Sequence, residues 1–157
     1  LEKYEYDNGT YCIVVPRSID DIYREGIVLK HCIHTCDIYL QRMDIRETYL
    51  IFLRHSAEPD TPWYTVEIEP GGNIRQKKSV LNEAYKDLDD AMPFLQEWQQ
   101  WVNKNLSEED KKLAEKSDKA RREGYKKLRE QKKIVWHGSL QGTLLADALE
   151  SDFMEVI

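Results

Sequence analysis

The first half of the chain carries the short apolar runs that are typical of β-strands. Thr10–Pro16 is a β-branched run closed by a proline, and Thr48–Arg54 is almost continuously apolar, as a central strand would be. Trp63–Glu69 alternates between apolar and polar residues, and the turn sequence Gly71–Asn73 leads from it into Ile74–Lys78. Strands joined by such connections predict an antiparallel meander.

The alternating strand has an apolar side and a polar side. Tyr64, Val66 and Ile68 point to one face of the predicted sheet, because successive side chains of a strand alternate between faces. The other face receives Trp63, Thr65, Glu67 and Glu69. We therefore expect polar side chains on a segment that otherwise belongs to the core.

Two helices are expected before the long apolar strand. Ser18 can cap the first helix, with Asp21 three residues later in a capping-box arrangement, and Gly26 is expected to end it. The second helix is expected to open at the His/Cys-rich stretch that follows. It would carry three side chains inward: Ile38, Tyr39 and Met43.

The pattern becomes helical again after Asn82. Asp89 or Asp90 can cap a helix, and Pro93 falls in its first turn, where a missing N–H costs little. Its inward stripe is predicted to be Ala91, Leu95, Trp98 and Val102. Ser107 with Asp110 starts a further helix, in which apolar positions are sparse.

These elements predict an α+β domain, with a small antiparallel β-meander sheet packed with helices on one face and followed by a basic C-terminal helical extension. A chain of 157 residues with 41% apolar content is long enough for one domain with a real core. We expect the domain to span residues 1–105 and a basic charged helix to span 106–133. Residues 134–157 would form an amphipathic segment that docks on the domain or on a partner.

Charge is distributed unevenly along the chain. The net charge is −6, yet residues 107–133 hold eleven Lys/Arg against seven Asp/Glu. This asymmetry indicates a basic arm on an acidic body. The arm is either a solvated helix with ion pairs such as Asp118 with Arg122 and Glu123 with Lys127, or an arm that contacts phosphates or a partner.

The chain is expected to be cytoplasmic. It has no run of eighteen apolar residues and no leader of the secretory type, so neither a membrane span nor membrane contact is expected. Three cysteines, an odd number, fit a reducing compartment better than a disulfide framework. Because the first residue is Leu1, we expect the chain to be a piece of a longer protein.

Residues 30–39 hold the densest candidate chemistry. Four side chains there can bind zinc: His31, Cys32, His34 and Cys36. On a helix, however, the two cysteines share one face and the two histidines another, about 100° away, so the four cannot meet at one ion. No second pair of His or Cys residues stands elsewhere in the chain, although Cys12, His55 or His137 could contribute in space. We expect no metal and no other cofactor.

Two other kinds of chemistry are open to the same stretch. Cys32 at a helix N-terminus beside His31 would have the lowered pKa of a nucleophile, although neighbouring helical residues point apart and an apolar cysteine is more commonly a core residue. Alternatively, His31 serves as a general acid/base or an anion contact within a larger polar set. In that set Glu67 would be the carboxylate partner of His31 or Arg54.

The remaining members of the polar set are suited to bind an anion. Arg54 and Lys78 could hold phosphate oxygens, while Gln76 and Asn82 could orient a polar ligand. Each also has an ordinary structural interpretation, since Arg54 and Glu67 could form a cross-strand salt bridge and the two amides could cap turns. Their position on neighbouring elements favours a single site.

Several separate motifs between residues 10 and 104 stand in a distinctive order and spacing. They are His31-Cys32-Ile33, Tyr39, Ile51-Phe52-Leu53-Arg54, Glu58-Pro59-Asp60, Pro62-Trp63-Tyr64-Thr65-Val66-Glu67, Ile74 with Gln76 and Lys78, and Asn82. Together they resemble the PcfJ-like family, whose members are encoded on conjugative plasmids, integrative elements, phages and bacterial genomes.

The resemblance implies which positions carry the function of the family. They are His31, Cys32, Arg54, Glu67, Gln76, Lys78 and Asn82. The chain departs from the family pattern in two places, with Lys78-Ser79 where Arg-Gly is expected and Cys36 where an aromatic residue is usual. The second departure further weakens the zinc interpretation.

The family implies a role in plasmid or mobile-element DNA processing and no particular reaction. Our leading hypothesis is an accessory domain that engages nucleic acid or a protein of a DNA-processing complex. The polar set would form a phosphate-type anion pocket, and the arm would contribute Lys126, Lys127 and Arg129. The alternatives are a metal-independent hydrolase or transferase that uses His31 or Cys32, and a purely structural interaction module.

Overall fold

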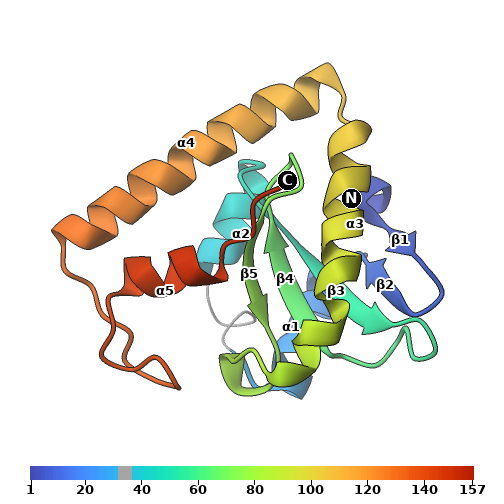
Figure 1. Ribbon diagram of the computed structural model, residues 1–157, viewed down its shortest axis with the longest axis horizontal. Helices are drawn as coiled ribbons and strands as arrows, with labels where there is room; N and C mark the ends of the chain where they lie inside the picture. The colour runs from blue at the N-terminus through green and yellow to red at the C-terminus, as the bar shows by residue number, and fades with distance from the viewer. Residues whose placement is uncertain (32–36) are drawn as a thin grey trace.

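A five-stranded antiparallel sheet forms the centre of the protein (Figure 1). The computed structural model describes residues 1–31 and 37–157. The strands pair in chain order: β1 (Tyr6–Asp7), β2 (Tyr11–Val14), β3 (Tyr49–His55), β4 (Tyr64–Ile68) and β5 (Ile74–Lys78). This order confirms the predicted α+β meander. The sequence missed β1, because a strand of two residues has no alternation to detect.

Helices lie between and after the strands. The α-helices are α1 (Ile19–Leu29), α2 (Asp37–Asp44), α3 (Met92–Lys104), α4 (Glu108–Glu130) and α5 (Leu145–Asp152), and the short 3-10 turns are η1 (Glu2–Tyr4), η3 (Val80–Asn82) and η4 (Lys86–Ala91). None of these helices, within the residues described, combines the length and the apolar character needed to cross a membrane.

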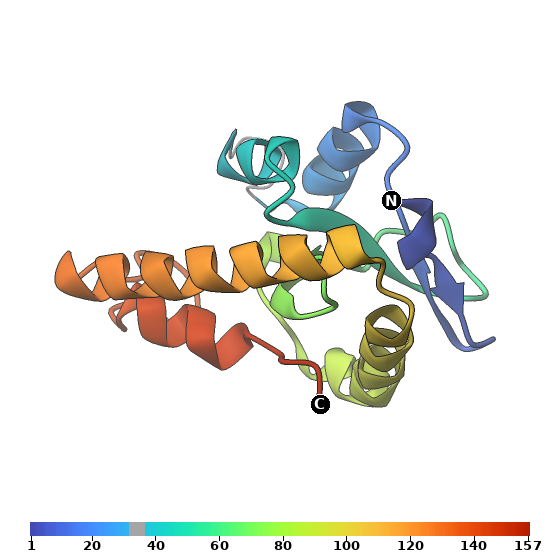
Figure 2. The same ribbon diagram turned by 90° about the horizontal axis from the view of Figure 1, so that it is seen from above.

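The helices cover both faces of the sheet, whereas the sequence predicted one covered face (Figure 2). On one side α3 packs over Ile51 and Leu53 of β3. On the other side α1 and α2 pack over Leu50 and Phe52. The continuous apolar run of β3 is the physical reason, because a strand of this kind presents apolar side chains to both faces.

α1 continues past the glycine at which the sequence predicted its end. Ser18 is the N-cap residue as expected, but the predicted capping box is wrong, because the Ser18 side chain makes no capping hydrogen bond and Asp21 accepts from the Arg17 backbone instead. The helix runs through Gly26 to Leu29. It stops at Lys30, whose φ of 54° is left-handed. Gly26 lies on the buried face together with Ile22 and Leu29, and the packing of that face outweighs the low helix propensity of glycine.

α2 turns only part of its predicted apolar face toward the sheet. Tyr39 and Met43 pack beside the cluster on the α1 side, as predicted. Ile38 is 47% exposed, so the expectation that it points inward is wrong. The face of α2 that contacts the sheet is formed by Tyr39, Leu40 and Met43, which lie within about 100° of one another around the helix, and Ile38 falls outside it.

α3 supplies the largest part of the core on its side of the sheet. The predicted stripe is confirmed, because Leu95 and Trp98 are fully buried and Val102 nearly so. Pro93 lies in the first turn as expected. The predicted aspartate cap is wrong, since Asp89 and Asp90 belong to η4, which runs directly into α3 and leaves Ala91 as its N-cap residue.

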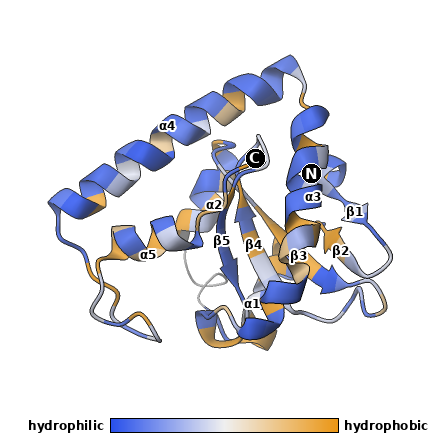
Figure 3. Ribbon diagram, in the orientation of Figure 1, coloured by the Kyte–Doolittle hydropathy of each residue, from blue (hydrophilic) through white to orange (hydrophobic). Residues whose placement is uncertain are grey.

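α4 is a hydrophilic helix that nevertheless docks on the body (Figure 3). Ser107 caps it as predicted, with its Oγ accepting a hydrogen bond from the Asp110 backbone at 3.1 Å. The predicted pair of Asp118 and Arg122 is present at 2.8 Å. Ser117 is buried, and its hydroxyl donates to the Glu47 carbonyl at 2.7 Å. Polar contacts therefore hold this helix in place.

The strongest of these contacts is made to Glu69, at the end of β4. Glu69 is 1% exposed, and its carboxylate accepts hydrogen bonds from Arg75 Nε at 2.8 Å and from Arg121 Nη1 at 2.6 Å. The Arg121 guanidinium also lies 4.0 Å from the centre of the Phe153 ring. α4, β5 and the C-terminal segment thus meet at one buried charge.

The last segment of the chain covers the outer edge of β5 (Figure 1). Met154 forms an isolated antiparallel bridge with Ile74, in which the two backbone hydrogen bonds measure 2.9 and 2.8 Å. Gln99 of α3 donates from Nε2 to the same Met154 carbonyl at 2.8 Å. Part of the edge strand is therefore paired, which removes backbone groups that could join another sheet.

Arg121→Ala is expected to lower the free energy of unfolding by about 3 kcal/mol, because Glu69 would keep its buried charge while losing one of two arginine partners. Arg122→Ala is the matched control, since this neighbouring side chain is 70% exposed and should leave stability almost unchanged. Urea unfolding of both variants measures the difference. Equal losses in the two variants would contradict the importance of the Glu69 contact.

Candidate functional site

The polar side of β4 faces α1 and α2 and holds the first of the predicted site residues. His31 comes just after α1, and its Nε2 lies 2.9 Å from Thr65 Oγ1. Both side chains are buried. His31 therefore lies against the sheet, and its ring reaches solvent only if neighbouring groups move.

Glu67, two residues along the same face, is enclosed by polar partners. Its Oε2 accepts from Thr48 Oγ1 at 2.7 Å and from Arg42 Nη1 at 2.9 Å, and its Oε1 accepts from Gln76 Nε2 at 3.1 Å. The suggested cross-strand salt bridge with Arg54 is wrong. The strand register places Leu50 opposite Glu67, and Arg54 lies four residues further along β3.

Arg54 instead pairs with Glu25 of α1. Its guanidinium donates through both terminal nitrogens to the two carboxylate oxygens, with Nη2 at 2.7 Å from Oε1, and its Nε donates to the Pro59 carbonyl at 3.2 Å. The guanidinium carbon lies 4.7 Å from the centre of the Phe52 ring. Arg54 and Glu25 are both buried, so the cation is already neutralised where the sequence predicted an anion contact.

The Arg54–Glu25 pair lies at the edge of a cavity of about 300 Å³. Arg17 and Arg24 also line this cavity, together with Asp21 and Asp60. Charges of both signs are therefore mixed within it, which suits a zwitterionic or mixed polar group better than a bare phosphate.

Three of the predicted ligand-binding residues share a different cavity, of about 130 Å³. Gln76, Lys78 and Asn82 line it from β5 and η3. His137 and Asp152 line it from the C-terminal segment, and Lys78 Nζ lies 3.4 Å from Asp152 Oδ2. The C-terminal segment thus closes one side of the predicted anion site.

Most of the predicted polar site residues lie close to one another in the structure, but they do not all line one cavity. Gln76 bonds to Glu67 and also lines the smaller cavity, so it links the buried carboxylate with Lys78 and Asn82. Arg54 lies at the other cavity, and the two cavities share no lining residue. The sequence-predicted residues therefore belong to two neighbouring places on one face of the sheet.

Most of the clustered His and Cys residues considered for zinc binding or nucleophilic catalysis lie outside the described part of the chain. Cys32, His34 and Cys36 all belong to the stretch 32–36, which the structure does not describe. Within residues 1–31 and 37–157, no group of three His, Cys, Asp or Glu side chains is arranged to hold a metal ion. Cys12 is a buried free thiol, and burial raises its pKa.

The predicted arm residues lie on the C-terminal half of α4. Lys126 and Arg129 line a cavity between α4 and α5, while Lys127 is exposed elsewhere on the helix. Arg129 is paired with α5, through Asp147 at 2.6 Å and Glu150 at 2.8 Å.

Several residues of these cavities were not predicted from the sequence, Glu25 foremost among them. Glu25 shares the buried face of α1 with Ile22, Gly26 and Leu29. A carboxylate within an apolar helical stripe is a usable signal, because a buried charge requires a partner. Asp152 gave no such signal, since its contact with Lys78 joins segments far apart in the chain.

Arg54→Met and Glu25→Leu are each expected to lower the free energy of unfolding by about 3 kcal/mol, because each leaves one charge buried without its partner. The double variant should lose much less than the sum of the two, since it removes both charges. Urea unfolding of the three variants gives the coupling energy. Additive losses would mean that the pair is not coupled.

The loss in Arg54→Met should be smaller at about pH 5 than at about pH 7. Burial raises the pKa of the Glu25 carboxyl, and the hydrogen bonds and charge of Arg54 oppose that shift. Without Arg54 the folded-state pKa lies still further above the unfolded value. Protonation in acid then favours the folded state, and this contribution is lost as pH rises through the folded-state pKa. A loss independent of pH would exclude Glu25 as its source.

No curated protein and no solved structure matches the chain at a significant level. The family described as PcfJ-like protein matches residues 1–92, which include the whole sheet, α1, α2 and every predicted position from His31 to Asn82. The matched range is more than half of the chain. This protein therefore belongs to the PcfJ-like family.

Proposed function

We propose that this protein is an accessory domain of a mobile genetic element that engages nucleic acid through cationic groups on α4 and a polar anion pocket on β5. Membership of the PcfJ-like family suggests an association with plasmids. The family description names no reaction, and the proposal therefore depends on the charges and cavities of this chain.

The observation that carries the proposal is the charge asymmetry of α4. Residues 107–118 hold three Lys/Arg and five Asp/Glu, whereas residues 119–133 hold eight Lys/Arg and two Asp/Glu. The first part also contains Ser117, which docks on the body, and Lys3 pairs with Asp110 at 2.6 Å. In the second part Arg121 is bound to Glu69 and Arg129 to α5, so the remaining cations of this docked helix are the ones available to contact phosphates.

The cavity on β5 supports the same proposal. Lys78 supplies a cation, and Asn82 supplies an amide group that can donate to phosphate oxygens. Gln76 lines the same cavity, but its Nε2 already donates to Glu67 at 3.1 Å and to Tyr39 at 3.4 Å. Asp152 occupies the position of an anion beside Lys78 in the structure. A phosphate group would replace this partly exposed carboxylate as the partner of Lys78.

Labelled DNA and RNA are expected to bind in a salt-dependent manner, with affinity falling steeply between about 50 and 200 mM salt. Replacing Lys126, Lys127 and Arg129 by glutamine should weaken binding about tenfold or more and reduce the slope of log affinity against log salt by about two to three. Fluorescence anisotropy titrations at several salt concentrations provide both quantities.

The matched control replaces Lys111, Lys112 and Lys116 by glutamine on the first half of the same helix. This variant has the same change in net charge and alters only exposed positions. It should bind much more tightly than the first variant. If both variants weaken binding equally, the effect comes from net charge and not from the position of the three arm residues. Absent or salt-independent binding would contradict the proposed function.

A further inference from the structure

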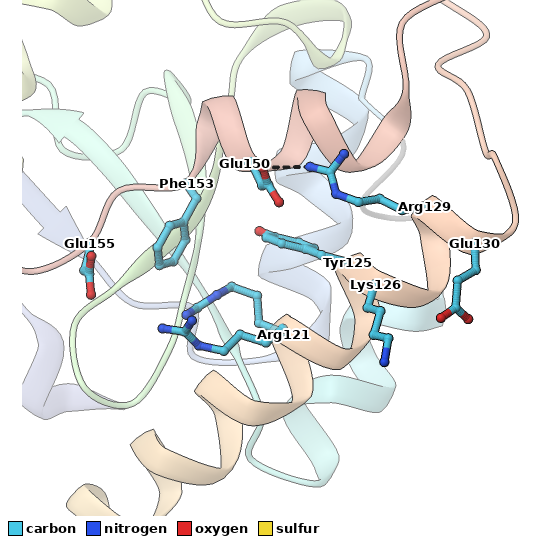
Figure 4. A pocket seen from close by; sticks show the side chains of 9 residues that line it. Arg121, Tyr125, Lys126, Arg129, Glu130, Glu150, Phe153 and Glu155 are labelled. Atoms are coloured by element: carbon cyan, nitrogen blue, oxygen red, sulfur yellow. Dashed lines mark ion pairs between the residues drawn. The ribbon is translucent and has the colours of Figure 1, made fainter.

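The C-terminal half of α4 and the end of α5 line an open cavity of about 480 Å³ (Figure 4). This volume lies in the range of pockets that hold small ligands, about 300–1,000 Å³. Its lining combines aromatic, cationic and acidic side chains from two segments far apart in the sequence. None of the positions predicted to bind an anion on the sheet contributes to it.

Two aromatic rings give the cavity a flat, partly apolar surface. Tyr125 of α4 and Phe153 at the end of α5 point toward one another in Figure 4. Both rings are half-buried, and the Arg121 guanidinium already lies over Phe153. Burial raises the pKa of the Tyr125 hydroxyl, so the ring is neutral at physiological pH. Neutral aromatic rings in a concave site favour a planar guest such as a nucleobase.

The cations around the cavity differ in their availability. Arg121 and Arg129 are engaged by carboxylates of the body and of α5. Lys126 is exposed and forms no ion pair with any residue of the described ranges, and Arg122 is 70% exposed. Exposed ion pairs contribute little stability, so Arg122 can exchange its carboxylate for a phosphate.

We infer that this cavity binds one base of a single-stranded nucleic acid, with the base against Tyr125 and the flanking phosphates on Lys126 and Arg122. The inference rests on the proposed function, and it specifies the form of nucleic acid that α4 engages. Three carboxylates, Glu130, Glu150 and Glu155, also line the cavity, and Glu150 is paired with Arg129 at 2.8 Å. A carboxylate there repels a phosphate, and the sugar–phosphate chain therefore runs along the outer cations.

A single strand fits this lining better than a duplex does. In a duplex, each base face is stacked on its neighbours and is unavailable to a tyrosine ring, and exposing it costs unstacking energy. Single strands offer free base faces, and stacking on an aromatic side chain is tolerant of sequence. The cations alone would hold either form, so the aromatic ring is the distinguishing group.

The test compares labelled single-stranded DNA, single-stranded RNA and the matching DNA duplex by anisotropy. Tyr125→Leu should weaken binding of at least one single strand about tenfold and change duplex binding less than about twofold. Tyr125→Phe keeps the ring and should retain single-strand affinity. A strand containing a fluorescent adenine analogue should lose emission on binding to the wild-type protein, but not to Tyr125→Leu.

Tyr23→Leu is the matched control, because Tyr23 is partly exposed on α1 and does not line the cavity. It should leave all affinities unchanged. Circular dichroism and urea unfolding of Tyr125→Leu and Tyr125→Phe establish that both variants are folded.

The outcomes separate this inference from the proposed function. If the wild-type protein binds no nucleic acid, the proposed function fails and the inference falls with it. If it binds duplex at least as tightly as single strands, or if Tyr125→Leu binds single strands normally, only the inference is overturned. Competition by a polyglutamate peptide as strong as that by the single strand would also overturn it, because the cavity would then accept acidic peptides.

Discussion

Two carboxylates, Glu67 on β4 and Glu69 just after this strand, set the arrangement of the elements around the sheet. Both are buried, and a buried carboxylate is tolerated only with cationic or hydrogen-bonding partners. Glu67 forms an ion pair with Arg42 of α2, and Glu69 forms one with Arg121 of α4. The positions of the helices therefore depend on pairing these buried carboxylates as well as on burying apolar surface. α4 has almost no apolar face, so its position depends mainly on the ion pair with Glu69.

This use of charge also limits where a ligand can be recognised. Arg54 and Arg75 are each bound to two or more groups of the protein itself, and their geometry leaves little capacity for a guest. Lys126 and the exposed Arg122 have far more freedom. Binding of polyanions is thus more compatible with the rim of α4 than with the interior of the sheet, where an added anion would compete with a carboxylate.

Local patterns in the sequence were sufficient to predict most of the helices and strands, but not the contacts between them. The alternation around Val66 and the stripe through Trp98 predicted the strand and the helix that pack together, because burial follows periodicity. The Ser107 cap was equally local. Arg54 was recognised as a special position, but its partner Glu25 lies 29 residues away on another element. Such pairings follow from the three-dimensional path of the chain, which no short pattern encodes.

Trp98 also bears on how the chain acquires this structure. Its indole Nε1 donates to the Tyr4 carbonyl at 2.8 Å, across 94 residues of sequence. β3, β4 and β5 are joined by short connections and can pair early, whereas β2 pairs with β3 across α1 and α2. The apolar face of the sheet remains uncovered until α3 packs on it, and α3 lies almost wholly beyond the family match to residues 1–92. During synthesis on the ribosome, the apolar face of the sheet would therefore remain exposed, and prone to aggregation, until residue 104 has emerged.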